Sequence, residues 1–456
     1  MQNLLGGKFG RYQRVADRSG ATIDTCQATT GDVILMNRNT SMVNHWDRSL
    51  LKISTGALIL TAVILPAGSF AGIPFKHVAY FFCCATLFIC WFRGVKINST
   101  YLALFIGSLL FVTFYMLVGS FYATSPFYYT FAEGTSFIST ISVVLLILMA
   151  NSSNSIEDKE IVLFVFYGIL IFSLWKFVVL LLLYFNIVPF HNLMLFFENY
   201  LRFKPVTLEM PGEFQRITFS AQDLGAVIFL FLLPAYPGIF SKVSRFFRII
   251  FMFTGTAAVV SNYSRFFFIF LAILWFYLFL FKFSFKQRLF ACAIVVVILL
   301  LSFSWIMEAY ELRFKSNMAA GSDITRFYQI SALIAGWEES PILGGGIGYY
   351  AKNYIRSMYF YEVQWIAFLA KLGIVGIIYL LFLASLLFYK ILSGKRSLDH
   401  YALAFILLFT LLSGFTNPLL LGAATSILYV LPLMVASILR KKLISQATST
   451  STSRAV

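Results

Sequence analysis

The sequence contains little charge for its length. Only 12% of its 456 residues are Asp, Glu, Lys or Arg, whereas 60% are apolar and the mean hydropathy is +0.83. Soluble domains carry about 25% charged residues, so this chain has too few polar groups to cover the surface of a water-soluble fold. Soluble globular classes are therefore excluded.

Histidine and cysteine are also scarce, at four and five residues. No histidine pair has i, i+4 spacing and no CxxC pair occurs, so the sequence predicts neither a metal centre nor a disulfide framework. GGGIGYY, beginning at Gly344, resembles a phosphate-binding glycine loop but lacks the preceding strand and the GK[ST] ending. We therefore expect no nucleotide site and no cofactor, and we interpret this segment as a flexible turn.

Long apolar runs are abundant and repeatedly reach the roughly 20 residues that cross a bilayer. They predict an all-α polytopic integral membrane protein with about 12 transmembrane helices. The expected spans lie near Ile53–Ala71, His77–Phe92, Tyr101–Val118, Ser136–Ala150, Ile161–Tyr184, Ala221–Phe240, Ile249–Val260, Phe266–Phe281, Leu289–Ile306, Gly373–Leu392, Tyr401–Leu412 and Leu420–Leu439.

Lys and Arg residues gather at alternate ends of these spans. The net charge of +16 therefore indicates membrane topology rather than a nucleic-acid partner. With an even number of spans, the N-terminal basic residues and five later clusters fall on one side, which predicts cytoplasmic termini. The clusters are Arg93 and Lys96; Lys242, Arg245 and Arg248; Lys282, Lys286 and Arg288; Lys390, Lys395 and Arg396; and Arg440, Lys441 and Lys442.

The chain divides into three parts by composition. Residues 1–50 form a polar cytoplasmic segment, disordered over about its first 35 residues, with Met36 and Met42 as alternative starts. Residues 51–442 form the transmembrane domain, and 443–456 a polar cytoplasmic tail. Without a signal peptide, we expect the first span to direct insertion.

Two expected periplasmic loops, 186–219 and 308–361, are much longer than the others and are where function is expected. The second contains helical periodicity from about Ile324 to the residues before Pro341. We expect an amphipathic helix there, followed by the glycine turn and a half-helix that returns to the membrane.

Three arginines on the outer side break the positive-inside pattern: Arg216, Arg265 and Arg326. Guanidinium groups bind phosphate oxygens bidentately, and a lipid-linked diphosphate would place its head group at this depth. The alternatives are that Arg265 only anchors a helix end and that Arg216 pairs with Glu213.

Glu362 lies at the start of the returning half-helix. A carboxylate there could act as a base, or it could only interact favourably with the helix dipole. Asp223, Lys371 and Tyr361 are accessory candidates. Ionisable residues at membrane depth are functional candidates by default, although Lys371, like Lys176, could equally extend toward the interface. Tyrosines in SMYFYE could stack on sugar rings.

These residues resemble a known family. TRFYQISALIAGWEESPILGGGIGYY followed by EVQWIAFLAKLGIVGII resembles the C-terminal signature of the bacterial O-antigen ligase and polymerase superfamily. SNYSR is similar to its serine-arginine span entry, and FQRITFSAQDLGAVI to its earlier arginine segment. The resemblance covers about Pro211 to Leu392. It implies that Arg216, Arg265 and Arg326 bind the lipid diphosphate.

The ligases carry a histidine where this chain has Glu362, and this difference favours a polymerase. The resemblance then implies a metal-independent glycosyltransferase of the bacterial inner membrane that joins undecaprenyl-diphosphate-linked repeat units on the periplasmic face. Its partners would be those glycans, membrane lipid and a chain-length regulator, with no nucleic acid. The alternatives are an O-antigen ligase that uses a lipid A core and, in another class, a flippase or other transporter.

Overall fold

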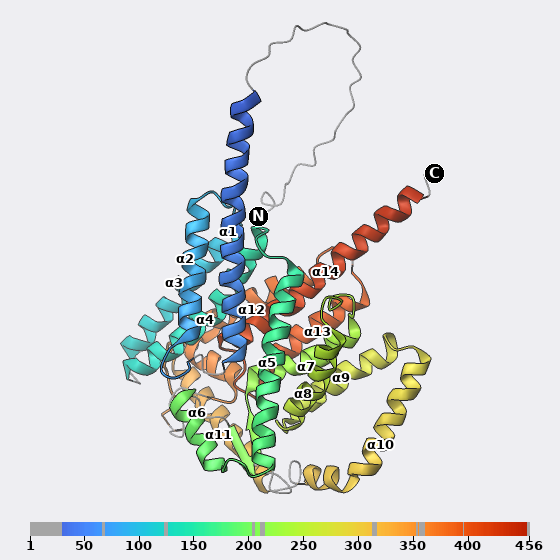
Figure 1. Cartoon of the computed structure of the whole chain (residues 1–456). Helices are drawn as coiled ribbons and strands as arrows, with labels where there is room; N and C mark the ends of the chain where they lie inside the picture. Colours follow the sequence, from blue (N-terminus) through green and yellow to red (C-terminus); the bar gives the residue numbers. More distant parts are fainter. Residues whose placement is uncertain are drawn as a thin grey trace. The chain divides into compact units, whose positions relative to one another are not determined.

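The computed structural model describes residues 30–65, 69–122, 126–202, 206–209, 215–311, 317–352, 354, 361–394 and 396–453. Residues 1–45 form one unit and Trp46–Val456 a second, larger one. The elements in Figure 1 are α1 Thr30–Ile64, α2 Phe75–Phe92, α3 Ser99–Tyr122, α4 Phe127–Ser152, α5 Asp158–Tyr184, α6 Phe190–Tyr200, β1 Val206–Glu209, β2 Gln215–Thr218, α7 Ser220–Ala235, α8 Arg245–Val260, α9 Arg265–Phe281, α10 Phe285–Tyr310, α11 Asn317–Glu339, α12 Gln364–Leu392, α13 Leu398–Leu412, the 3-10 turn η3 Ser413–Phe415 and α14 Ala423–Ser453.

A helix lies at each of the twelve expected spans, as α1 to α5, α7 to α10 and α12 to α14. Within the described residues, seven helices are long and apolar enough to cross a membrane: α2, α3, α4, α5, α12, α13 with η3, and α14. Helices α7 and α9 are apolar but shorter. A multi-pass helical membrane protein is therefore supported, and the count of twelve spans stays a prediction.

Both terminal segments contain more helix than expected. Helix α1 begins at Thr30, inside the segment predicted to be disordered, and α14 continues through the expected tail to Ser453. Residues 1–29 lie outside the described part of the chain. Met36 and Met42 both lie within α1. Both helices extend beyond their apolar residues into polar sequence, which a search for hydropathy does not detect.

The first long loop contains regular structure. Helix α6 is followed by an antiparallel hairpin in which Val206 faces Thr218 and Leu208 faces Arg216. Each strand has only four residues, too few for an alternating pattern to stand out from the sequence. The predicted all-α class is supported, and this hairpin is an addition that the sequence did not indicate.

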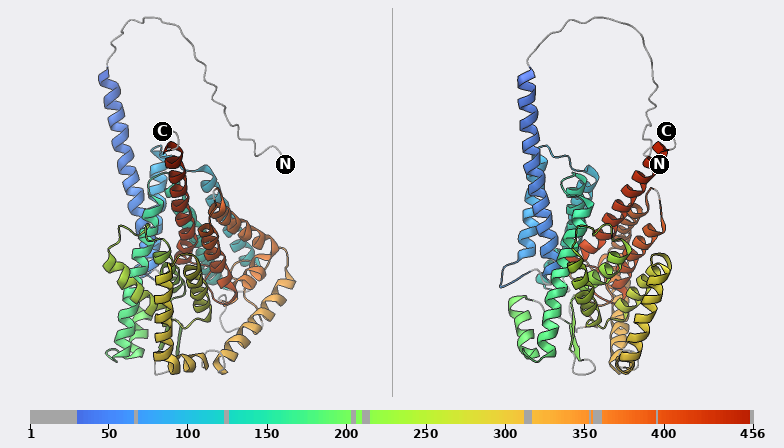
Figure 2. Two further views of the ribbon diagram at one scale, coloured as in Figure 1. Left: turned by 90° about the vertical axis from the view of Figure 1, so that its right-hand side faces the viewer. Right: turned by 45° about the vertical axis from the view of Figure 1, so that its right-hand side comes forward.

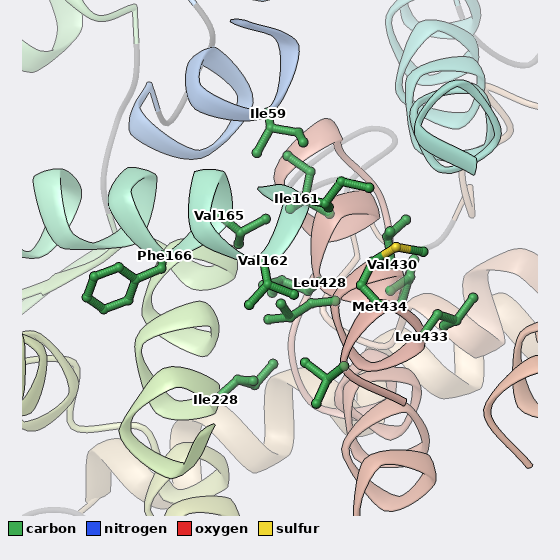
Figure 3. Close-up of a cluster of buried hydrophobic side chains, with 14 of the residues drawn as sticks. Ile59, Ile161, Val162, Val165, Phe166, Ile228, Leu428, Val430, Leu433 and Met434 are labelled. Carbon is green, nitrogen blue, oxygen red and sulfur yellow. The ribbon is translucent and has the colours of Figure 1, made fainter. Parts of the chain in front are cut away.

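The largest core lies between α5, α7 and α14. In Figure 3, Val162 of α5 lies near Leu428 of α14 and Ile228 of α7, whereas Phe166 points to the other side. The Phe166 ring packs against the rings of Phe229 and Phe240, with each pair of centroids 5.6 Å apart. These side chains are buried, at 3% exposure or less. Close packing of apolar side chains holds the helices at fixed positions along one another. In Figure 2, α10 lies at the edge of the larger unit, away from this core.

The predicted basic clusters meet at one end of the larger unit. Arg93 pairs with Asp47, and Lys441 pairs with Asp158 at the first residue of α5. Arg440 donates to the carbonyl of Lys390 at 2.9 Å. Because α5 rises about 40 Å to Tyr184, its two ends lie on opposite sides of a bilayer. This arrangement agrees with the positive-inside prediction, and we call it the basic end.

Helix α12 is broken at Gly373, whose φ of 60° and ψ of −169° belong to a region that essentially only glycine adopts. The break leaves helix amides without their usual acceptors. The amide of Ile374 donates to Pro341 O at 3.0 Å, and that of Val375 to Ile342 O at 3.2 Å. The segment after α11 therefore replaces the missing helical bonds.

The carbonyls on the other side of the break are also satisfied. Their donors come from residues 344–348, which we call the glycine segment, and from α3. The Gly345 amide donates to Ala370 O at 2.9 Å, and the Gly346 amide donates to Lys371 O at 2.8 Å. The Tyr115 hydroxyl donates to Leu372 O at 2.8 Å. An unsatisfied backbone group costs several kcal/mol in lipid. The broken helix thus depends on the glycine segment.

The glycine segment is closely packed rather than flexible. Gly344, Gly346 and Gly348 all have positive φ, between 68° and 89°. A Cβ atom on Gly346 would lie 2.0 Å from the amide nitrogen of Gly119, and one on Gly348 would lie 2.3 Å from Thr130 Oγ1. The glycines are therefore used in a turn, as expected, and they also permit close approach to α3 and α4.

Asp223 forms a buried ion pair with Lys176. The two side chains are fully buried, and Lys176 Nζ lies 2.7 Å from Asp223 Oδ1 and 2.9 Å from Ala258 O. Asp223 Oδ2 accepts from Asn262 Nδ2 at 2.6 Å and from the Phe219 amide at 2.9 Å. The pair is therefore internal and joins α5, α7 and α8.

Replacing Gly373 by Ala should destabilise the protein. The backbone strain alone costs about 1–3 kcal/mol, and the added Cβ would lie 2.2 Å from Ile342 O. Thermal unfolding in detergent should show a lower midpoint. Gly107→Ala in α3 is the control, because no atom lies within 4 Å of the added Cβ. Equal midpoints for the two variants would contradict the role given to Gly373.

Lys176→Met should also lower the unfolding midpoint. The substitution leaves the Asp223 carboxylate buried without its cation, which typically costs about 3–5 kcal/mol. Adding Asp223→Asn removes that charge and should restore part of the stability. If the double variant unfolds at the same temperature as the single variant, the buried charge is not the cause.

Candidate functional site

Three of the predicted site residues lie in one chain of ion pairs. Arg265 Nη2 is 3.1 Å from Asp323 Oδ1, and Arg326 Nη1 is 3.0 Å from the same oxygen. Arg326 Nε is 3.0 Å from Glu362 Oε2. Arg265 and Arg326 thus meet through one aspartate, and Glu362 joins the chain through Arg326.

Three elements supply these side chains. Arg265 is the first residue of α9, directly after its N-cap Ser264. Asp323 and Arg326 are three residues apart on α11, so they project from the same face of that helix. Glu362 comes from the segment before α12. Arg265 therefore does more than anchor a helix end.

Gln329 continues the same face of α11 and holds the segment that carries Glu362. Its Oε1 accepts the Glu362 amide at 3.0 Å, and its Nε2 donates to the Tyr354 hydroxyl at 3.1 Å. Beneath it, Leu333 and Val363 belong to a small apolar cluster. Gln329 is only 3% exposed, so this bridge is part of the protein interior.

Helix α12 begins at Gln364, two residues later than the predicted start at Glu362. Glu362 therefore lies just outside the helix, and its amide is bonded to Gln329 rather than to a helical carbonyl. Its carboxylate is 41% exposed and is directed to Arg326. The dipole of α12 is thus a smaller influence on Glu362 than the adjacent guanidinium.

The formal charges of the four residues in the ion-pair chain cancel, since two guanidinium groups face two carboxylates. The arginine side chains are 26% and 21% exposed, whereas Asp323 is 57% exposed. One oxygen of Asp323 contacts both arginines, and an anionic ligand oxygen could bind the same two groups. The site can therefore accept a phosphate-bearing group if that group replaces Asp323.

Arg216 lies on β2, opposite Leu208, and its side chain is outside the described residues, as is Glu213. The buried network around Asp223 connects the end of β2 with the turn before α9. Thr218 Oγ1 donates to Asn262 Oδ1 at 3.3 Å, and Asn262 in turn donates to Asp223. The network therefore joins the two segments that carry Arg216 and Arg265.

Lys371 is internal and does not reach the ion-pair chain. Its Nζ lies 2.5 Å from Glu133 Oε1, and the two side chains are 1% and 7% exposed. Glu133 Oε2 accepts the Gly348 amide at 2.8 Å. This pair thus connects α12 and α4 to the glycine segment. Of the two alternatives for Lys371, the structure shows the buried position and not the extension toward the interface.

Tyr361 is also internal. It is 2% exposed, its ring centroid lies 5.3 Å from Lys371 Nζ, and its hydroxyl accepts the Ala351 amide at 2.7 Å. Burial raises the pKa of this hydroxyl, so the group stays neutral at physiological pH. Tyr361 therefore supports the Glu362 segment from beneath and presents no ring face to solvent.

The sequence reasoning missed Asp323, Gln329 and Glu133. Asp323 and Gln329 lie three residues on either side of Arg326, and this spacing on an amphipathic helix was the available signal. Glu133 is an isolated acid in the segment before the expected fourth span, and nothing local connects it with Lys371. A contact between residues 238 positions apart is not visible in one sequence.

Within the described residues, no three His, Cys, Asp or Glu side chains gather closely enough to hold a metal ion. No curated protein and no solved structure matches the chain significantly. Residues 250–381 match a family model described as O-antigen ligase. This segment contains Arg265, Asp323, Arg326 and Glu362, and the match confirms the resemblance to the O-antigen ligase and polymerase superfamily.

Proposed function

We propose that the protein is a polysaccharide polymerase that joins undecaprenyl-diphosphate-linked repeat units at the periplasmic face of a bacterial inner membrane. The observation that carries the proposal is the ion-pair chain from Arg265 through Asp323 and Arg326 to Glu362. It brings together two guanidinium groups that could bind a diphosphate and two carboxylates, at the end of the larger unit away from the basic end. The family match supports a glycosyltransferase-like enzyme that acts on lipid-linked glycans.

The diphosphate of the donor would replace the Asp323 carboxylate between the two arginines. A diphosphate carries more negative charge than one carboxylate and offers several oxygens, so it can bind both guanidinium groups at once. Asp323 is the most exposed member of the chain and can turn toward solvent. Arg216 would add a third cation from β2, as the family resemblance implies.

Glu362 would then accept the proton of the acceptor hydroxyl. The hydroxyl oxygen attacks the anomeric carbon of the donor sugar, and the bond from that carbon to the diphosphate oxygen breaks. The electron pair leaves with the diphosphate, where the arginines stabilise the developing charge. The configuration at the anomeric carbon inverts, and the arginines supply the countercharge in this step.

The carboxylate at position 362 favours the polymerase over the ligase, because the ligases that the sequence resembles carry a histidine there. A ligase that transfers the glycan to a lipid A core remains the second candidate and would use the same arginines. Transport is less well supported, since Lys176 and Lys371 both have buried carboxylate partners. Those two cations therefore do not line an open path.

Deleting the gene from its source bacterium should leave surface polysaccharide with single repeat units on a gel. The wild-type gene should restore the long ladder, and Glu362→Gln should not, because losing a general base slows such reactions about 10²–10⁴-fold. Membrane levels of the variant should match the wild type. A persisting ladder would exclude Glu362 as the base.

The matched control is Glu339→Gln, which removes an exposed carboxylate at the end of α11 that pairs only distantly with Lys352, at 4.0 Å. This variant should restore a full ladder. A deletion strain with no glycan on the core would indicate a ligase, and an unchanged profile would exclude both functions.

Arg265→Lys keeps the positive charge but loses the planar pair of donors. With purified protein and a lipid-linked repeat unit, we expect kcat/KM to fall roughly tenfold or more, as for the loss of one charged hydrogen bond. Arg326→Lys should behave similarly. Arg245→Lys, at the start of α8 near the basic end, is the control and should leave the rate unchanged. Unchanged rates for all three variants would contradict bidentate binding.

A further inference from the structure

An apolar cavity of about 280 Å³ lies between α3, α4, α12 and α14. Its α4 wall includes Thr140, Val144 and Leu148, and its α12 wall includes Leu383, Ala384 and Leu387. Its lining is almost entirely hydrocarbon. The cavity exposes little polar surface, so its chemistry fits a hydrocarbon chain.

Two contacts between α3 and α12 lie beside the cavity. Toward the proposed active site, the Ser108 and Tyr379 hydroxyls lie 2.7 Å apart, and Phe111 stacks on Tyr379 with ring centroids 4.0 Å apart. Toward the basic end, Lys390 Nζ contacts the Tyr101 hydroxyl. On α3 the lining begins at Thr100 and ends at Leu104, before the first contact.

The distance between these two contacts corresponds to one leaflet. From Tyr379 to Lys390 the helix rises about 16 Å, and the hydrocarbon core of a bilayer is about 30 Å thick. On α12 the lining runs from Trp365 and Phe368 to Tyr389 and Lys390, which lie at the basic end. A lipid whose head group lies at the basic end can therefore place its tail in the cavity.

Two cations lie together at that end. Arg440 Nη2 donates to the carbonyls of Lys390, at 2.9 Å, and Ile391, at 3.3 Å, so its guanidinium is next to the end of α12. Among the residues that the structure describes, no carboxylate forms an ion pair with Lys390 or Arg440. Tyr389 is 72% exposed beside them, at a level where aromatic side chains favour the membrane interface.

From this arrangement we infer that the cavity holds one acyl chain of an anionic glycerophospholipid, with its phosphate at Lys390 and Arg440. The lipid belongs to the leaflet at the basic end, which the positive-inside pattern makes the cytoplasmic leaflet. Basic groups between transmembrane helices on that side suit anionic head groups. The site is separate from the proposed reaction, so its failure would leave the proposed function untouched.

Native mass spectrometry of the full-length purified protein tests this inference. After incubation in mixed micelles, one phosphatidylglycerol should be retained and phosphatidylcholine should be lost. Lys390→Gln should weaken retention about fivefold, the typical effect of one cation near an anionic lipid. Ala384→Phe should abolish it by filling the cavity. Equal retention of both lipids, or unchanged retention in both variants, would overturn the inference.

The controls are substitutions of the same kind at residues that do not line the cavity. Lys442→Gln removes an exposed cation of the same basic end, and Ile378→Phe places a ring on the outward face of α12, where Ile378 is 61% exposed. Both should retain phosphatidylglycerol, and all variants should elute as monodisperse protein. A polyprenyl phosphate as the retained lipid would overturn the assignment and indicate instead a tail site for the donor.

Discussion

Backbone hydrogen bonding around Gly373 determines the geometry of α12 and of the segment that carries Glu362. In a bilayer, a broken helix is stable only if other groups bond the amides and carbonyls that the break releases. Here the segment from Pro341 to Gly346 supplies most of those partners, and Tyr115 supplies one more. The direction of the first half of α12 is thus fixed by the glycine segment, and Glu362 precedes that half directly.

Helix α11 likewise fixes the position of Glu362, through polar side chains. Asp323, Arg326 and Gln329 repeat at three-residue spacing, and they contact the start of α9, the Glu362 carboxylate and the Glu362 amide. The buried pairs Lys176–Asp223 and Lys371–Glu133 lie deeper and fix the surrounding helices. Asp223 and Lys371, which the sequence suggested as accessory site residues, are therefore members of buried ion pairs, and their accessory role stays a prediction.

The positions of the helices could be predicted because lipid-exposed helices must be apolar along about 20 residues. The arginines and Glu362 could be predicted because charge on the outer side stands out against that background. The break at Gly373 and the partner of Lys371 could not, since both depend on contacts between distant segments. Strands as short as β1 and β2 also leave no usable periodicity, and the side chain of Arg216 lies outside the described residues.

Asp323 has a consequence for how a reaction cycle would end. The Asp323 carboxylate contacts both arginines, so a weakly charged anion would gain little by replacing it. Under the proposed function, a diphosphate lipid would compete because it brings more charge and is concentrated in the membrane. When the glycan has been transferred, the same carboxylate can return to the two guanidinium groups. An internal competitor of this kind shortens the residence of the spent carrier, which would otherwise remain bound as a product inhibitor.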